Sequence, residues 1–433
     1  MILLFVPVLA VIELFFGATG TWWSLGGFDV RMVLFIGTFI CLVLLVLLDS
    51  MRQRGYWLLS DWLPGTFLIM NLPWLTLIPL LNGVSIGQSF DEANALLVLV
   101  LFYPCIYLLR SHRLAWGKIK AMTGLLGALF AFLHVVIWVV GSLFDKSNSI
   151  GANLQAIYRI QSGIYVGIMP DGFYRVFFVT SLLLVPTFFG FLHGVLEQSD
   201  RRKLNTCCLV LVTAAIIVTY TRSCWIAVLC GAALTIALRA RRSGRLRRMM
   251  VLSALAMVVL AVGFWMLDVL GSQNISVALS HNEILKRLAS VVNSLDSGNK
   301  TRLEETTRLL ATWRTSPVFG HGYGSSIPGY YASSVKNFSY EATAPALLMK
   351  TGLVGLALWV AFMVGIVQRA RRKFAADEAG RVWYAYWLGG FVAFVLAVQT
   401  NPLLFNNVRM AILLFFIIDA TTIDRPSHSP QLP

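Results

Sequence analysis

Long apolar segments separated by short polar connections dominate the chain. A helix needs roughly 17–25 apolar residues to cross the hydrocarbon core of a bilayer. We predict twelve such spans, and the weakest are the third, interrupted by prolines, and the short pair flanking Arg222. The spans lie at about 1–17, 30–48, 57–81, 93–109, 121–143, 173–196, 204–220, 224–238, 249–267, 345–366, 382–399 and 408–423. The pattern predicts an all-α polytopic membrane protein, with residues 1–433 forming one integral-membrane domain.

One large hydrophilic segment interrupts this pattern, at 268–344, between the ninth and tenth spans. It contains an amphipathic stretch near 281–292 and a second one over 302–313. In the second, Leu303, Thr306, Leu309, Leu310 and Trp313 are predicted to line one face, with Arg302, Glu304, Glu305 and Arg308 on the others. A glycine-rich turn at 320–324 follows, and its backbone could approach a ligand closely. Loops of this length are usually functional, as lids or substrate-binding loops.

Composition agrees with a membrane protein. Hydrophobic residues make up 58% of the chain, charged residues 13%, and the mean hydropathy is +0.74. These values lie outside the range of soluble domains. The first apolar segment lacks a basic start and a cleavage site, so we interpret it as a retained span. The six cysteines lie in or beside spans without a CxxC pair, which argues against a disulfide framework or a metal site.

Basic residues fix the predicted orientation. Alternate connections carry the basic clusters, at 52–54, 110–120, 201–203, 239–248, 369–381 and 425. Because cytoplasmic loops are enriched in Lys and Arg, this side is predicted to be cytoplasmic, with both termini inside. Topology and anionic lipid then account for most of the net charge of +15, and nucleic acid is not an expected partner.

Arg222 is the most informative single residue. It lies in the turn Tyr220-Thr221-Arg222-Ser223-Cys224-Trp225 between two apolar segments, on the predicted outer face. A guanidinium so close to lipid is costly unless an anion or a water-filled cavity receives it. The alternative is an interfacial arginine that extends its charged end into water.

A few polar residues fall inside the spans. Glu13, Asn71 and His134 each need an internal partner, and hydrogen bonds between helices are expected for Asn71 and His134. A secondary transporter or a flippase of lipid-linked oligosaccharide would also have twelve spans. However, carboxylates are scarce in the spans and the two halves show no repeat, so the pattern favours other functions.

Three segments in fixed order carry a resemblance to a known family. They are Thr221-Arg222-Ser223-Cys224-Trp225-Ile226; Arg302-Leu303-Glu304 followed by Trp313 and Pro317-Val318-Phe319-Gly320-His321-Gly322; and Glu341 followed by Leu347-Leu348-Met349-Lys350-Thr351-Gly352-Leu353-Val354-Gly355. Together they resemble the bacterial O-antigen ligase and O-antigen polymerase superfamily. The resemblance is carried by about 204–366, and in the N-terminal half only by the spans.

The resemblance implies a metal-independent glycosyltransferase without a cofactor, in the bacterial inner membrane, with an active site that faces the periplasm. Its expected partners are a glycan donor linked to undecaprenyl pyrophosphate, an acceptor glycan (a lipid-linked repeat unit or lipid A-core), the bilayer and a chain-length regulator. Arg222 and Arg302 match positions that hold the pyrophosphate. Arg222 would also stabilise the leaving group, because guanidinium forks bind phosphate in a bidentate manner. A solvated surface position is the alternative for Arg302.

The sequence departs from the ligase pattern at the acceptor site. Where ligases carry a His-Asn pair, this chain has Glu341-Ala342. A carboxylate can act as the general base on an acceptor hydroxyl, so we assign this role to Glu341, with His321 as the rival base. Further candidates are Arg308 and Tyr323, the latter for stacking on sugar rings. Because polymerase-like relatives carry Glu at this position, the preferred function is an O-antigen or exopolysaccharide polymerase. The alternative is a ligase that joins polysaccharide to lipid A-core of lipopolysaccharide.

Overall fold

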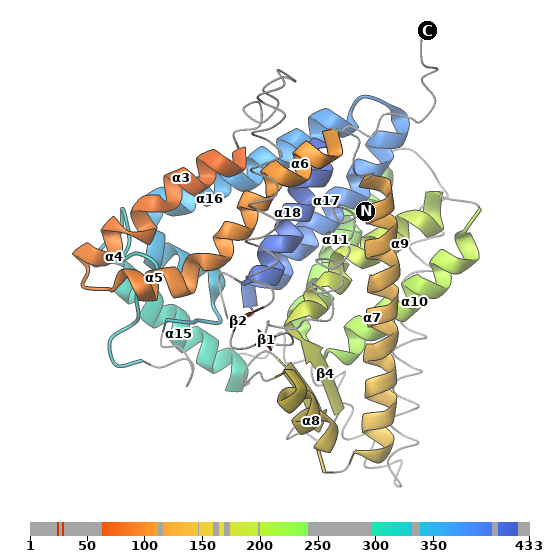
Figure 1. Ribbon diagram of the computed structural model, residues 1–433, viewed down its shortest axis with the longest axis horizontal. Helices are drawn as coiled ribbons and strands as arrows, with labels where there is room; N and C mark the ends of the chain where they lie inside the picture. Colours follow the sequence, from red (N-terminus) through yellow and green to blue (C-terminus); the bar gives the residue numbers. More distant parts are fainter. Residues whose placement is uncertain are drawn as a thin grey trace.

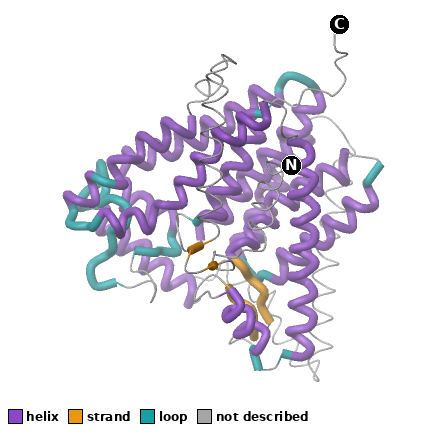
Figure 2. Tube along the Cα trace, viewed as in Figure 1, coloured by secondary structure: helices purple, strands orange, loops and turns teal. Residues whose placement is uncertain are grey.

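The computed structural model describes residues 24–25, 28–29, 63–110, 116–145, 147–158, 164–168, 174–197, 200–240, 297–330, 338–400 and 406–422. The predicted spans at 1–17, 30–48 and 249–267, the residue Glu13 and the amphipathic stretch at 281–292 lie outside these ranges. Over the described residues, the fold is a bundle of helices with short antiparallel strand pairs (Figures 1 and 2).

The helices follow one another along most of the described chain. They are α3 (Leu63–Leu75), α4 (Leu77–Leu81), α5 (Ile86–Ala93), the 3-10 helix η2 (Asn94–Leu101), α6 (Phe102–Arg110), α7 (Trp116–Phe144), α8 (Ser149–Tyr158), η3 (Val179–Leu183), α9 (Leu184–Glu197), α10 (Arg202–Val218), α11 (Arg222–Ala240), α15 (Ser297–Trp313), α16 (Thr343–Phe374), α17 (Glu378–Ala397), η4 (Val398–Thr400) and α18 (Asn407–Thr421). The strands are β1 (Ser24–Leu25), β2 (Phe28–Asp29), β3 (Ile164–Ile168) and β4 (Tyr174–Phe178).

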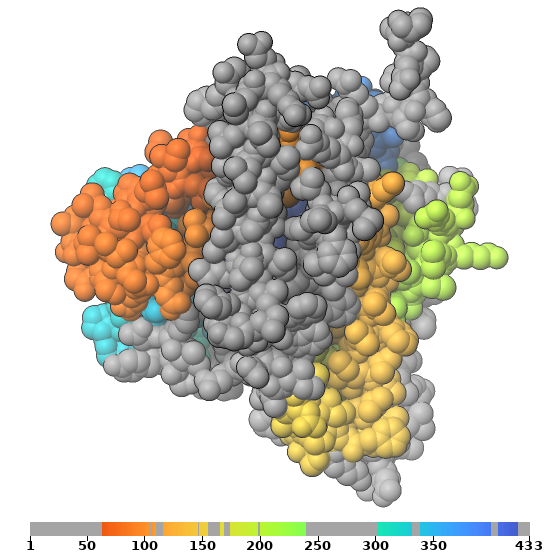
Figure 3. Space-filling model, in the orientation of Figure 1, coloured from red at the N-terminus to blue at the C-terminus, as the bar shows by residue number. Residues whose placement is uncertain are grey.

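Six helical segments among the described residues are long and apolar enough to cross a membrane. They are Leu63–Leu81, Ile86–Leu109, Trp116–Phe144, Val179–Glu197, Arg222–Arg239 and Thr343–Phe374. Large apolar side chains face outward from them, among them Leu81 (77% exposed) and Leu125 (70% exposed). In Figure 3, α3 to α5 form one flank of the molecule and α10 the opposite flank. Such surfaces suit lipid. The structure therefore supports a helical membrane protein, while the number of twelve spans remains a prediction.

Two predicted spans differ from the structure in their details. The segment predicted as a helix over 173–196 begins with β4, which pairs with β3, so the fold is not purely α-helical. The third span is broken at Thr76, between α3 and α4. Pro79 explains this break, since its ring excludes the carbonyl of Leu75 from the helical ladder. The hydroxyl of Ser89 donates to that carbonyl instead, at 2.8 Å.

Small residues bring α11 and α17 together. A Cβ at Gly231 would lie 2.4 Å from the Gly389 carbonyl oxygen, and Thr235 Oγ1 donates to Ala385 O across the same contact at 3.2 Å. Small residues let helix backbones approach closely, and van der Waals packing then stabilises the pair in a membrane. These two contacts show that the helices run antiparallel, and both lie in the centre of the bundle (Figure 1).

Polar anchors join the helices at the end that carries the basic clusters. The carboxylate of Asp419, buried on α18, accepts hydrogen bonds from the indoles of Trp116 (2.6 Å) and Trp383 (3.2 Å). Lys120 Nζ lies 3.4 Å from the same carboxylate. Inside the bundle, His134 on α7 meets Ser181 Oγ at 2.8 Å, which confirms the predicted hydrogen bond between helices.

A buried ion pair holds the opposite part of the bundle. Lys350 on α16 and Glu92 on α5 form a short ion pair, and their side chains are 1% and 6% exposed. Lys350 Nζ also donates to Phe338 O at 2.7 Å, and Glu92 Oε2 accepts from Gly324 N at 2.6 Å. This ion pair therefore connects α5, α16 and two positions, Gly324 and Phe338, of the segment between α15 and α16.

We expect Lys350→Met to lower the free energy of unfolding by about 3–5 kcal/mol, because it leaves the Glu92 charge buried without its partner. Adding Glu92→Gln should recover most of this loss, since the amide oxygen can still accept from Gly324 N. The control is Arg308→Met, which breaks an exposed pair with Glu304 and should cost less than about 1 kcal/mol. Denaturant unfolding in detergent measures the free energy of unfolding of all three variants. Equal losses in Lys350→Met and Arg308→Met would contradict the prediction.

Candidate functional site

Arg222 lies at the start of a membrane helix. The chain turns between α10 and α11 at Tyr220, which has a positive φ of 47°. Arg222, which is half-buried, is the first residue of α11. The N-terminus of a helix carries partial positive charge from its backbone N–H groups, and this adds to the charge of the guanidinium. The sequence predicted Arg222 between two spans; the structure places it between α10 and α11, and α11 is long and apolar enough to cross a membrane, while α10 as a span remains a prediction.

Two further arginines lie near this turn. Arg175 on β4 donates from Nε to Thr219 O at 2.9 Å and from Nη2 to Thr221 Oγ1 at 3.2 Å. Arg409, near the start of α18, is 3% exposed, and it lies near Cys224 in the first turn of α11, as Arg175 does. Neither residue was expected at this turn from the sequence, because β4 and α18 are far from it along the chain.

The predicted ligand Arg302 and the predicted base Glu341 contact each other directly. Arg302 Nε on α15 donates to Glu341 Oε2 at 2.8 Å, just before α16 begins. The side chains are 35% and 45% exposed, so a ligand can reach both. The bond uses Nε, and a guanidinium has four more N–H donors on its terminal nitrogens. Arg302 can therefore hold Glu341 and a phosphate at the same time.

Arg222 lies at the same end of the bundle as this pair. Gly231 faces Gly389, and Thr235 faces Ala385, across α11 and α17. Continued to the start of α11, this antiparallel register places Arg222 level with Val398. The carbonyl of Val398 accepts a hydrogen bond from Thr343 Oγ1 at 3.0 Å, two residues after Glu341.

Glu305 is the neighbour that sequence reasoning missed. It was expected on a polar face of its helix, and Leu303 on the apolar face, but Glu305 is 2% exposed and Leu303 65%. Glu305 Oε1 accepts a hydrogen bond from Ala342 N at 2.6 Å. Burial raises the pKa of Glu305 above its ordinary value, and the bond from Ala342 opposes this increase. The face that α15 buries is decided by contact with the start of α16.

His321 does not lie free as an alternative base. Its Nε2 lies 3.0 Å from Thr312 O and 3.1 Å from Thr315 Oγ1, and its backbone N donates to Met349 O at 3.0 Å. These bonds tie the imidazole to the end of α15. In this arrangement, the ring of His321 is used in contacts that fix the turn to α15.

The glycine-rich turn packs against the protein itself. Gly322 N donates to Lys350 O at 2.7 Å, and Leu353 N donates to Pro317 O at 3.0 Å. At Gly352, α16 has a non-helical kink with φ 65°, and this kink receives the turn. The expected close approach of this backbone to a ligand is thus an approach to α16.

Tyr323 and Arg308 are placed differently from the expectation. Tyr323 is completely buried, and its hydroxyl donates to Asn71 Oδ1 at 2.7 Å, so its ring cannot stack on a sugar in this arrangement. Asn71 thereby bonds to the loop and not to another membrane helix. Arg308 is exposed, pairs with Glu304 at 2.9 Å, and lies over the Tyr330 ring, 5.1 Å from its centroid.

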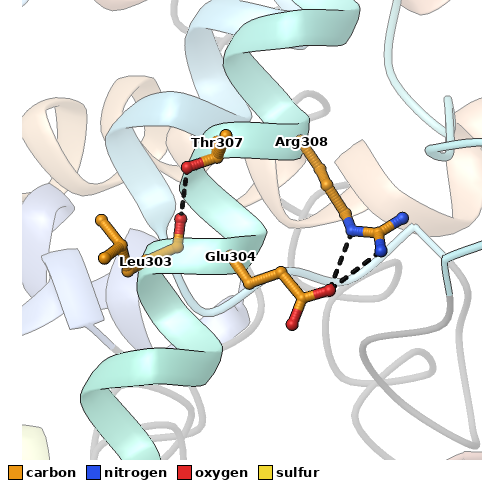
Figure 4. A pocket seen from close by; sticks show the side chains of 4 residues that line it. All are labelled: Leu303, Glu304, Thr307 and Arg308. Carbon is orange, nitrogen blue, oxygen red and sulfur yellow. Dashed lines mark hydrogen bonds and ion pairs between the residues drawn. The ribbon is translucent and has the colours of Figure 1, made fainter. Parts of the chain in front are cut away.

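A shallow hollow of about 440 Å³ lies on the outer face of α15. Its lining is Leu303, Glu304, Thr307 and Arg308, and Figure 4 shows the Glu304–Arg308 pair at its edge. The hollow does not include Arg302 or Glu341. Over the described ranges, no three His, Cys, Asp or Glu side chains are grouped as a metal site.

Comparison with known proteins bears on the part of the chain that forms this site. Residues 207–360 match the family model described as O-antigen ligase. This match confirms the resemblance to the O-antigen ligase and polymerase superfamily, and supports a function of that type. The segment contains Arg222, Arg302 and Glu341, and it ends within α16. A search of the curated proteins finds no match to the chain.

The kinked contact between the glycine-rich turn and α16 can be tested with a matched pair of glycines. A Cβ at Gly320 (φ 67°) would lie 2.5 Å from the Lys350 backbone, whereas at Gly329 (φ 69°) it would meet nothing within 4 Å. Both alanine variants pay the left-handed backbone cost of about 1–2 kcal/mol. We expect Gly320→Ala to lose about 1–3 kcal/mol more from the clash. Thermal unfolding in detergent compares them, and equal losses would contradict the close approach.

Proposed function

We propose, starting from the match of residues 207–360 to the O-antigen ligase family, that the chain is a glycosyltransferase acting at the outer face of a bacterial inner membrane. It transfers an oligosaccharide or polysaccharide from undecaprenyl pyrophosphate to the hydroxyl of an acceptor sugar. The observation that carries the proposal is the contact between Arg302 and Glu341 at the end of the bundle where α11 begins with Arg222.

Arg222 and Arg302 bind the pyrophosphate of the donor in this proposal. Guanidinium groups make bidentate, charge-assisted hydrogen bonds with phosphate oxygens, and the start of α11 adds its positive dipole. As the sugar–phosphate bond breaks, negative charge grows on the pyrophosphate, and fixed positive groups stabilise that charge. Arg175 is held beside the same turn and increases the positive potential there.

Glu341 acts as the general base. The acceptor oxygen attacks the anomeric carbon of the donor, its proton passes to the Glu341 carboxylate, and the electron pair of the breaking bond leaves with the pyrophosphate. The ion pair with Arg302 holds the carboxylate in place and joins the base to the leaving-group site.

Polymerase is the preferred form of this activity, with a ligase as the second candidate. The description of the matching family favours a ligase. Glu341 favours a polymerase, because it stands where ligases carry a His-Asn pair. A polymerase would take the lipid-linked repeat unit as acceptor and work with a chain-length regulator, whereas a ligase would take lipid A-core. The proposed chemistry assigns no step to a metal or a cofactor.

The proposed residues can be tested in membranes supplied with lipid-linked repeat units. We expect Arg222→Lys and Glu341→Gln to lose product by about 100-fold or more, because each removes an interaction made with the transition state. Arg314→Lys and Glu304→Gln are matched controls on the exposed surface, and both should remain active. Quantified polymer on gels is the readout. Near-normal product from both site variants would refute the mechanism.

A second experiment separates the two candidate activities. The purified protein is given lipid-linked repeat units alone, and in parallel with lipid A-core. We expect elongated glycan on the lipid carrier in both reactions, because a polymerase uses the repeat unit as its acceptor. Product that forms only when lipid A-core is present would instead identify a ligase.

A further inference from the structure

Glu305 is a buried carboxylate without a role in the proposed reaction. It lies on α15, one helical turn after Arg302, so both side chains point from the same face of the helix. Both reach the chain around the start of α16, Arg302 at the Glu341 side chain and Glu305 at the backbone of Ala342. The side chain of Glu305 is 2% exposed, so it cannot itself contact an acceptor sugar in this arrangement.

The start of α16 needs a hydrogen-bond acceptor from outside the helix, and Glu305 provides it. The first N–H groups of a helix have no partner within the helix, and a polar side chain at the N-cap usually accepts from one of them. The N-cap of α16 is Ala342, which has no polar side chain and makes no side-chain cap. Glu305 Oε1 accepts from Ala342 N at 2.6 Å, and the backbone of Glu341 also donates to this carboxylate.

Glu341 is therefore held from two sides by one helix. Arg302 fixes its carboxylate, and Glu305 fixes its backbone and that of the next residue. The negative charge of Glu305 also suits the positive end of the α16 dipole. The charged groups that act on Glu305 are Arg302 on α15 and Glu341, two residues before α16. Glu304 and Arg308, also on α15, act on the neighbouring Tyr330.

We propose that Glu305 is a positioning residue for Glu341: it caps α16 from outside the helix and so sets the place of the Glu341 carboxylate against Arg302 and the acceptor. This role rests on the proposed function for its effect on rate, but the capping itself does not. Loss of the cap moves the base, and displacement of a reacting group by about 1 Å can cost on the order of 100-fold in rate.

Three variants test the role. Glu305→Gln keeps an oxygen that can accept from Ala342 N, while Glu305→Met keeps a similar size without an acceptor. Ala342→Pro removes the donor and leaves Glu305 unchanged, and the φ of −78° at Ala342 is close to the value that proline requires. We expect Glu305→Met and Ala342→Pro to lower kcat by about 10- to 100-fold with KM for the lipid-linked donor unchanged. Glu305→Gln should retain kcat within about threefold.

A double-mutant cycle shows whether Glu305 acts through Glu341. In the Glu341→Gln background, Glu305→Met should cause no further loss of the residual rate, because the base that it positions is already gone. An equal fold-loss in both backgrounds, or full kcat in Glu305→Met, would overturn the proposal. So would a rise in KM that accounts for the whole effect.

Hydrogen–deuterium exchange tests the cap without any activity. In detergent, the amides of Glu341 and Ala342 should exchange faster in Glu305→Met than in the unaltered chain. In Glu305→Gln their exchange rates should be unchanged. Unaltered exchange in Glu305→Met would overturn the cap. If exchange behaves as expected while the unaltered protein transfers no glycan, the proposed function fails and the capping role of Glu305 stands.

Discussion

The buried ion pair between Lys350 and Glu92 is the contact on which the arrangement of the site depends. Lys350 lies just before the kink at Gly352, and Glu92 belongs to a helix far away in sequence. A buried charge is tolerated only with a partner and further hydrogen bonds, and both ions have them, from Phe338 O and Gly324 N. The pair thus fixes the depth and rotation of α16 relative to α5.

That constraint extends to the chemistry, because α16 begins just after Glu341. The glycine-rich turn packs on the kink of α16, and α15 leads directly into that turn. The position of α15 along α16 is therefore fixed, and it places Arg302 and Glu305 against the start of α16. The buried pair of Lys350 and the two polar contacts at the start of α16 together define where the Glu341 carboxylate meets Arg302.

Positive groups at this end of the bundle come from separate parts of the chain. Arg175 is bonded to the turn before Arg222, and Arg409 lies near by on α18. Positive side chains on several sides and the dipole of α11 would attract an anion bound there. The site is partly shielded from water, which makes electrostatic interactions stronger.

By itself, the sequence determined the membrane class, the amphipathic helix that became α15, and the placing of Arg222 at a helix end, because apolar length and periodicity depend on neighbouring residues. Through three ordered motifs it also led to the prediction that Arg302 and Glu341 belong to one site. Only the tertiary structure decided that these two form a pair, that Glu305 and Tyr323 are buried, and that His321 bonds to the backbone. Those outcomes depend on contacts between distant segments, such as Glu92 with Lys350, 258 residues apart, and local patterns carry no information about which distant partner a polar side chain will meet.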